Sequence, residues 1–355
     1  MNRLLLKISK YYWTFLASPF ARMRRSHDSD NRILITRFDG LGDFFILVPF
    51  LQELINKKFR IVLVGPASNK SIVEHLALTV EYLVFDKSEI IQLLKKIKNY
   101  SFCYAMNLSM NQWGGIIVNQ SKSIKKIGLL QEREHYIYKG SKFFYDTIIS
   151  YPPSTHSFEV FNRLFNDIGI KLSVKPVIST NFTGGQSVII HPYGNWAPRR
   201  WPYFPELIKN LLGKGFHLKI IGTEKEHCEN KWVNEFAKSS NCVITPLKSI
   251  SHLLTLIEQC RAFIGNDSGP AHYASLIGKP TTVIWGPGFY ERIRPLGENV
   301  NICITPAKCR PCRQKGEICQ NGKADCLIGI SPEMVLEKFH GIGLQDSKEI
   351  GMCAY

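Results

Sequence analysis

A turn of small and polar residues in the second half of the chain has the composition of a phosphate-binding site. Residues 262–264 are apolar and suit a buried strand, and the turn GNDSGP that follows leads into a helical pattern. The N–H groups and the dipole at a helix start favour an anion, and Ser268 and Gly269 leave space for its close approach. His272, one turn into the helix, could face the same pocket. The alternatives are structural, because Asp267 and Ser268 are ordinary N-cap residues and a lone histidine is more often packed.

A second strand-to-helix turn carries two carboxylates. Arg32–Thr36 predicts a strand, and the segment RFDGLGD joins it to a helix predicted over Phe44–Ile55. Asp43 falls at the beginning of that helix and Asp39 four residues before it, so both would lie in the crevice at the strand's carboxyl end. Either could instead cap the helix. The glycine spacing is not GxGxxG and no acidic residue stands about 20 residues further on, which disfavours a nicotinamide dinucleotide site.

Both turns belong to an alternating pattern of strands and helices, which predicts an α/β fold with parallel sheets. The first half of the chain predicts strands and helices over Arg60–Val64, Leu83–Phe85, Glu89–Lys98, Cys103–Leu108 and His156–Ile168. Between about Trp113 and Tyr151 the pattern weakens and basic residues gather. We interpret this segment as irregular, either in contact with a charged acceptor or simply solvated.

The pattern restarts after the linker Lys175–Gly185, which contains two glycines. The second half predicts strands and helices over Ser187–His191, Phe204–Gly213, His217–Ile221, Val243–Ile244, Ile250–Gln259, Pro280–Trp285 and Ser331–Gly341. A chain of 355 residues is long enough for two cored domains. We therefore predict an N-terminal domain over 32–180 and a C-terminal domain over 181–355.

The chain is strongly basic, with 45 Lys and Arg against 29 Asp and Glu and a formal charge of +16. Such a charge predicts an anionic partner, either a nucleic acid, a phospholipid surface or a phosphorylated substrate. No module that interleaves aromatic and basic residues is visible, which disfavours nucleic acid.

Residues 1–31 precede the first predicted strand. Apolar residues recur at helical spacing from Leu4 to Leu16, but Lys7 and Lys10 interrupt them, so the run is shorter than the roughly 18 apolar residues that a span needs. A basic amphipathic helix on an anionic membrane surface is one interpretation, and a helix packed on its own protein is the other.

Four of the ten cysteines lie close together in the sequence. Cys309, Cys312, Cys319 and Cys326 have C-x2-C-x6-C-x6-C spacing within a Lys-, Arg- and Gly-rich loop at 309–326. This set could hold a structural zinc, or it could be a reduced surface loop, since the usual second C-x2-C pair is missing.

Three segments in order, RFDGLGD, HPYGNWAPRRWP and GNDSGPAH with the following GKPTTVIWGP, resemble glycosyltransferase family 9, the ADP-heptose:lipopolysaccharide heptosyltransferases. The resemblance covers roughly Arg32 to His340. It implies two facing Rossmann-like domains of the GT-B type, with no metal and no cofactor, and the absence of an apolar-flanked DxD pair agrees with this.

The resemblance also implies site residues. It makes Asp43 the catalytic base and places Arg199, with Arg200 adjacent, on the donor's phosphates. An acidic residue after the second strand of the C-terminal domain would hold the ribose, and Glu226 is the better match, with Glu224 as its rival. The turn implied to cradle the diphosphate consists of Asp267, Ser268, Gly269, Pro270 and His272.

The implied activity is inverting transfer of a sugar, heptose from ADP-heptose, onto a phosphorylated, lipid-linked lipopolysaccharide-core glycan. Such an enzyme would be cytoplasmic and peripheral on the inner face of the membrane. Tyr193 stands where the family usually has glycine, which would place a tyrosine beside the donor pocket, and Asp39 replaces a common serine. The alternatives are a GT-B transferase for another nucleotide sugar, and a non-catalytic scaffold that has kept the nucleotide pocket.

Overall fold

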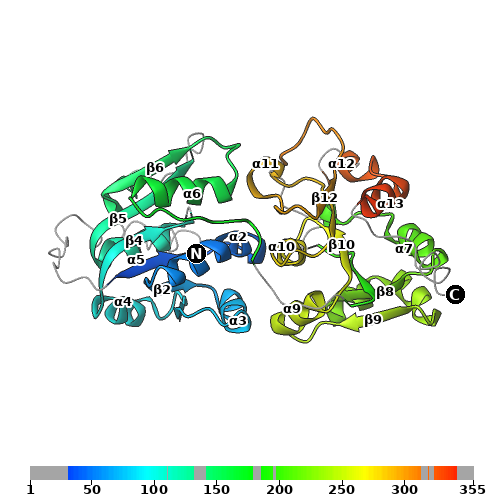
Figure 1. Ribbon diagram of the computed structural model, residues 1–355, viewed down its shortest axis with the longest axis horizontal. Coiled ribbons are helices and arrows are strands. Elements are labelled where there is room, and N and C mark those ends of the chain that lie inside the picture. Colours follow the sequence, from blue (N-terminus) through cyan, green and yellow to red (C-terminus); the bar gives the residue numbers. More distant parts are fainter. Residues whose placement is uncertain are drawn as a thin grey trace, which may run out of the picture. The chain divides into compact units, whose positions relative to one another are not determined.

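The computed structural model describes residues 31–109, 111–131, 141–178, 185–194, 197–312, 319 and 324–341. These residues form two six-stranded sheets in which all paired strands are parallel. Helices flank each sheet (Figure 1). The N-terminal segment 1–25, for which we predicted an amphipathic helix, lies outside the described residues.

The first sheet has the strand order β3-β2-β1-β4-β5-β6. Its strands are β1 (Arg32–Thr36), β2 (Arg60–Gly65), β3 (Glu81–Val84), β4 (Ser101–Asn107), β5 (Lys122–Gln131) and β6 (Thr147–Tyr151). The intervening helices are α2 (Leu41–Asn56), α3 (Ala67–His75), α4 (Ile90–Lys98), α5 (Gln112–Gln120), the 3-10 turn η2 (Ser141–Phe144) and α6 (Ser157–Asp167). Because β2 and β4 lie on opposite sides of β1, the winding reverses there, and the carboxyl ends of β1 and β4 form a topological switch point.

The second sheet repeats this order as β12-β11-β10-β7-β8-β9, with its switch point between β7 and β10. Its strands are β7 (Ser187–His191), β8 (His217–Gly222), β9 (Cys242–Pro246), β10 (Ala262–Asn266), β11 (Thr281–Ile284) and β12 (Val300–Cys303). Its helices are η3 (Ala197–Arg199), α7 (Phe204–Gly213), α8 (Glu224–Glu229), η4 (Lys231–Lys238), α9 (Ile250–Glu258), α10 (Gly269–Leu276), α11 (Tyr290–Ile293), α12 (Asp325–Ile328) and α13 (Pro332–His340).

The segment between Trp113 and Tyr151 is not irregular, contrary to our prediction. It contains α5, β5 and β6, and β5 pairs with both of its neighbours. We did not predict β5 because its lysines interrupt the apolar pattern of a strand. One of them, Lys126, is nevertheless only 7% exposed and donates from Nζ to the backbone oxygen of Asn119 at 2.5 Å. We did not predict α5 because it contains Gly114 and Gly115, and glycine lowers helix propensity. The basic segment 132–140 lies outside the described residues.

The described chain forms two compact units. The first contains the described residues up to Gly40, together with Phe50–Thr155 and Glu159–Val174. The second contains Leu41–Pro49, His156–Phe158 and the described residues from Lys175 onward. The long C-terminal stretch of the second unit therefore starts at Lys175, the first residue of the predicted linker. Helix α2 contributes its first half to the second unit, although the sequence had assigned all of it to the first domain.

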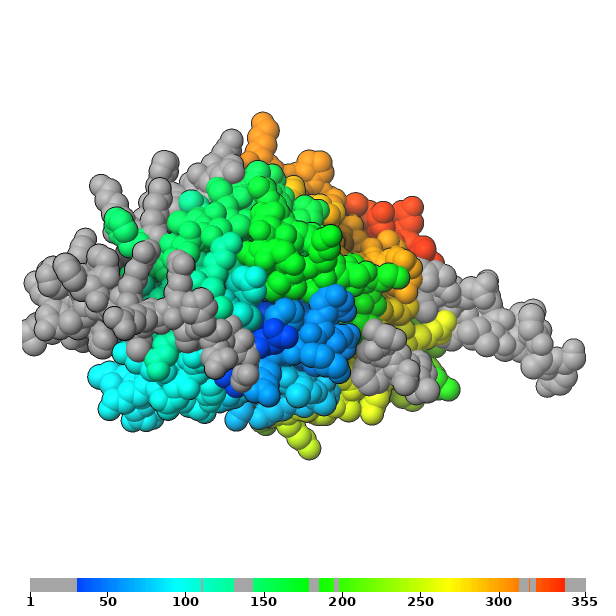
Figure 2. Space-filling model, turned by 60° about the vertical axis from the view of Figure 1, so that its left-hand side comes forward, coloured from blue at the N-terminus to red at the C-terminus, as the bar shows by residue number. Residues whose placement is uncertain are grey.

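Helix α4 shows how a basic outer surface is compatible with a buried core. Ile90, Leu93 and Ile97 are buried, whereas Lys95 and Lys96 on the other face are exposed. The cyan surface in Figure 2 includes this segment. None of the described helices combines the length and the apolar composition that a membrane span requires.

Candidate active site

The predicted phosphate-binding turn follows β10 and starts α10. Ser268 is the N-cap residue, with extended backbone angles of φ −157° and ψ 162°, yet its side chain does not cap the helix. Its Oγ is buried and makes no hydrogen bond with any part of the chain that the structure describes. A buried hydroxyl of this kind costs free energy unless a partner satisfies it, and a bound oxyanion would be such a partner. Ser268 thus occupies the N-cap position, but its side chain does not cap the helix.

Asp267 and Arg199 meet beside this turn. Nη1 of Arg199 lies 3.7 Å from Oδ2 of Asp267, and the Asp267 side chain is 4% exposed. A Cβ added at Gly288 would collide with the same oxygen, so the turn after β11 covers the carboxylate. Burial raises the pKa of Asp267 to about 6, with Arg199 opposing the rise and Asp43 adding to it. Asp267 is therefore a carboxylate that can take up a proton near neutral pH.

His272 is buried, which agrees with the alternative that it is a packed histidine. It nevertheless lies inside the candidate site. Burial lowers its pKa to about 3, helped by the nearby charges of His156 and Arg199. The imidazole is neutral at physiological pH, so it can contribute a hydrogen bond but no positive charge. Arg199 is consequently the cation of this group.

Asp43 lies in the first turn of α2, as predicted, and this turn packs against the start of α10. A Cβ at Gly42 would lie 2.8 Å from Cδ2 of His272, and a Cβ at Gly269 would lie 2.9 Å from Cβ of Leu41. Only glycine at both positions lets the two helix starts approach this closely. Asp43 is half-buried and near enough to raise the pKa of Asp267.

Asp39 does not cap α2, which was one of our two interpretations. The N-cap is Gly40, and no side chain caps this helix. Asp39 is instead ion-paired with Arg37, the Arg37 Nη1 to Asp39 Oδ2 distance being 3.0 Å. This pair is part of the first unit.

The other two predicted donor contacts take part in local structure. Nε of Arg200 donates to the backbone oxygen of Gly194 at 3.1 Å, so Arg200 stabilises its own loop. Glu226 forms a capping box at the start of α8, where its Oε2 accepts from the backbone N of Thr223 at 2.7 Å. This fixes the position of Glu226, whereas its rival Glu224 is the exposed first residue of α8.

Asn266 is a site residue that our sequence analysis missed. It is fully buried at the end of β10, its Nδ2 donates to the Pro192 oxygen at 2.8 Å, and its Oδ1 accepts from the Trp201 backbone N at 3.2 Å. It thereby ties both ends of the loop that carries Arg199 to the strand that leads to Asp267. The sequence signal was its place directly before Asp267 in GNDSG.

Tyr193 is buried and does not protrude from its loop. Its side chain is 1% exposed within the core, and its hydroxyl lies 2.7 Å from Nδ1 of the buried His227. We predicted it as an intrusion because only the substitution for glycine, and not the direction of the side chain, can be read from the sequence.

The loop cysteines do not form a metal site among the residues that the structure describes. Among the described residues, no three His, Cys, Asp or Glu side chains are arranged to hold a metal ion. Burial raises the pKa of Cys326, and the nearby Cys309 and Cys319 thiols add to the rise.

The family can now be decided from similarity to known proteins. The family described as glycosyltransferase family 9 (heptosyltransferase) matches residues 90–323. The chain belongs to this family. Its two parallel sheets constitute a GT-B fold, as the resemblance implied.

Individual members of family 9 are similar to this chain in sequence and in structure. Lipopolysaccharide heptosyltransferase 2 of Salmonella typhimurium is 26% identical over 168 residues, which are 42% of this chain and 45% of that protein. The chain thus spans about half the length of the curated relatives it matches.

Two solved E. coli structures share the fold over nearly their whole length. ADP-heptose lipopolysaccharide heptosyltransferase II has a TM-score of 0.69 at 16% identity, covering 88% of this chain and 98% of that one. Heptosyltransferase WaaC with ADP has a TM-score of 0.69 at 14% identity, covering 88% and 99%.

Proposed function

We propose that this protein is an inverting glycosyltransferase that transfers heptose from ADP-heptose to a lipopolysaccharide-core or related cell-envelope glycan. The observation that carries the proposal is the packing of two helix starts in the second unit. One of them bears Asp43, and the other presents an unsatisfied Ser268 hydroxyl next to the Asp267–Arg199 pair. The relatives named as lipopolysaccharide heptosyltransferases support the choice of acceptor, and the similar structure of heptosyltransferase WaaC solved with ADP supports the choice of nucleotide.

The donor's diphosphate would bind at the start of α10. The first-turn N–H groups and Ser268 Oγ would donate hydrogen bonds to its oxygens, and Arg199 would supply positive charge. As the bond from the sugar to the phosphate breaks, the leaving oxygen gains negative charge, which these donors stabilise. Glu226 would contact the ribose through the carboxylate that the capping box already orients.

Asp43 would act as the base. Its carboxylate takes the proton from an acceptor hydroxyl while that oxygen attacks C1 of the sugar from the face opposite the phosphate. The C1–O bond to the diphosphate breaks, ADP leaves with the electron pair, and the new glycosidic bond has inverted configuration. A positioned general base contributes about 10² to 10⁴-fold.

A nucleotide screen tests the donor assignment. We expect calorimetry to show selective binding of ADP over UDP, GDP and CDP, weakened about tenfold or more by Arg199→Ala. Arg200→Ala is the matched control and should cost less, because Arg200 is directed at the Gly194 carbonyl. Selective binding of another nucleotide would change the donor assignment, and no binding of any nucleotide would contradict the proposed donor site.

We further propose that the acceptor is phosphorylated and lipid-linked, and that the protein binds peripherally to the inner face of the cytoplasmic membrane. The formal charge of +16 supports an anionic partner of this kind. The apolar periodicity of residues 1–25, flanked by Arg22, Arg24 and Arg25, supports contact with an anionic lipid surface.

A further inference from the structure

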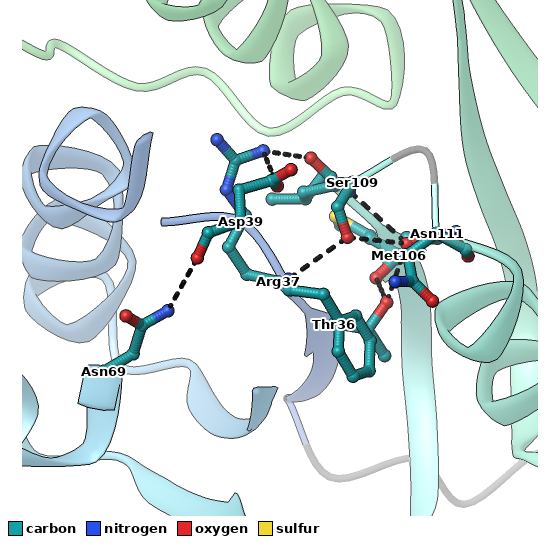
Figure 3. Close-up of polar contacts among 10 residues, drawn as sticks. Thr36, Arg37, Asp39, Asn69, Met106, Ser109 and Asn111 are labelled. Atoms are coloured by element: carbon teal, nitrogen blue, oxygen red, sulfur yellow. Dashed lines mark hydrogen bonds and ion pairs between the residues drawn. The ribbon is translucent and has the colours of Figure 1, made fainter. Parts of the chain in front are cut away.

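The first unit contains a buried arginine that the proposed chemistry does not use. Arg37 directly follows β1 and is 5% exposed. A buried guanidinium is costly unless it is paired and hydrogen-bonded, so its contacts show what it holds in place. Figure 3 shows Arg37 and Asp39 beside Ser109, with Asn69 extending toward Asp39.

Arg37 joins the loops that leave the two strands of the switch point. Its Nη1 pairs with Oδ2 of Asp39 at 3.0 Å and also donates to the backbone oxygen of Leu108, which follows β4. Its guanidinium carbon lies 5.1 Å from the centroid of the Phe161 ring on α6. One side chain thus connects β1, the β4 loop and α6.

The loop that follows Arg37 is fixed at each of its next two residues. The backbone N of Phe38 donates to Ser109 Oγ at 3.2 Å, and Nδ2 of Asn69 donates to the backbone oxygen of Asp39 at 3.4 Å. Ser109 is held in turn, because its backbone N donates to Oδ1 of the buried Asn107 at 3.3 Å. Arg37 holds the carboxylate of Asp39 directly.

The loop leads straight into the first turn of α2, which carries Asp43. Gly40 is the N-cap, and no side chain caps this helix, so the usual device that fixes a helix start is missing. The Arg37–Asp39 pair and the loop bonds around it therefore hold the backbone that leads into this first turn.

We propose that Arg37, acting through Asp39, is a positioning residue that fixes the start of α2 and with it the Asp43 carboxylate. The inference rests on the proposed role of Asp43 as the base. In this proposal Arg37 affects the reaction only through the position of Asp43. A displacement of the base of about 1 Å is enough to cost about a hundredfold in rate.

The test compares kcat, both KM values and thermal stability across Arg37→Met, Arg37→Lys and Asp39→Asn. We expect Arg37→Met to lower kcat tenfold to about a hundredfold. The donor KM should stay within twofold, and Arg37→Lys should recover part of kcat because it keeps a charge opposite Asp39. The double variant Arg37→Met/Asp39→Asn should be no slower than Arg37→Met alone, since the two residues act as one unit.

The control is Arg163→Met, which removes the exposed Arg163–Asp167 pair in the same unit and should leave kcat unchanged. If every Arg37 and Asp39 variant keeps kcat within twofold of wild type per folded molecule, the proposal is overturned. A fall in thermal stability with unchanged kcat overturns it equally, because Arg37 would then be merely structural. If Arg37→Met does not fold, Arg37→Lys and Asp39→Asn carry the same comparison.

Hydrogen exchange separates this proposal from the proposed function. Amides of Leu41–Phe44 should exchange at least tenfold faster in Asp39→Asn and Arg37→Lys than in wild type, whatever reaction the enzyme catalyses. Unchanged exchange there overturns the positioning role. A wild-type protein that transfers no heptose, but whose variants show the faster exchange, would refute the proposed donor and acceptor and leave the role of Arg37 standing.

Discussion

At the scale of single residues, the candidate site contains both neutral and charged side chains. His272 is neutral because burial holds its pKa near 3, and Arg199 is the positive group next to Asp267. The Asp267 carboxylate stands directly before the turn where the diphosphate is expected, and its pKa is already raised to about 6. Binding of an anion there adds a second negative charge beside a buried carboxylate.

Donor affinity should therefore depend on pH. A bound diphosphate raises the pKa of Asp267 further, so the complex holds more protons than the free enzyme, and affinity must increase as pH falls from 8 towards 6. A rise of one pKa unit on binding should increase the affinity about fivefold between pH 8 and pH 6, because the pKa of the free enzyme is itself about 6. Calorimetry with ADP-heptose across this range measures it, and Asp267→Asn should flatten the profile. An affinity that weakens towards pH 6 would contradict the account.

At the scale of elements, the site depends on two helices that start against each other. The first turns of α2 and α10 touch through Gly42 and Gly269, and behind them Phe45 packs on Tyr273 with ring centroids 5.1 Å apart. This contact lies in the second unit and joins the helix of the base to the helix of the diphosphate turn.

Gly42→Ala should impair activity far more than Gly40→Ala. The new methyl group at position 42 would press on the His272 ring, which is 5% exposed and has little room to move. We expect a loss of about tenfold or more in kcat/KM, because the first turn of α2 would shift. A Cβ at Gly40 meets nothing within 4 Å and suits its φ of −67°, so that variant is the control. Equal effects at the two positions would contradict this packing argument.

Elements with a clear pattern were predictable, and those that owe their place to tertiary contacts were not. Strand β7 was predicted at its observed bounds, and Asp43 was expected in the first helical turn, because apolar runs and glycine turns are local signals. Strand β5 was not predicted because its lysines interrupt the apolar pattern. The family resemblance could indicate Arg199 and Asp267 but not their pairing, because they belong to distant segments. It did not indicate Asn266, whose bridging role also joins distant segments.

At the scale of the whole molecule, positive charge is the dominant property. The net charge of +16 is spread along the chain, and residues 1–25 add six basic residues to an apolar periodicity. Each basic residue near an anionic membrane contributes about 1 kcal/mol of attraction. Such a surface would bring the enzyme to a lipid-linked acceptor.

Removal of residues 1–25 should release the protein from anionic vesicles. Co-sedimentation with phosphatidylglycerol-containing vesicles should fall at least tenfold relative to the full chain, and neutral vesicles should bind neither protein. Donor affinity should not change, which checks that the shortened protein is folded. Undiminished binding to anionic vesicles would assign the membrane contact to the rest of the chain.

The most direct test of the central claim is ADP release from ADP-heptose, with and without a lipopolysaccharide-core acceptor, in wild type and in Asp43→Asn. We predict acceptor-dependent release by wild type, and a kcat lowered by about 10² to 10⁴-fold in Asp43→Asn with the affinity for ADP unchanged. The amide has nearly the same shape as the carboxylate but cannot accept the proton. Near-normal transfer by a folded Asp43→Asn protein would show that Asp43 is not the base.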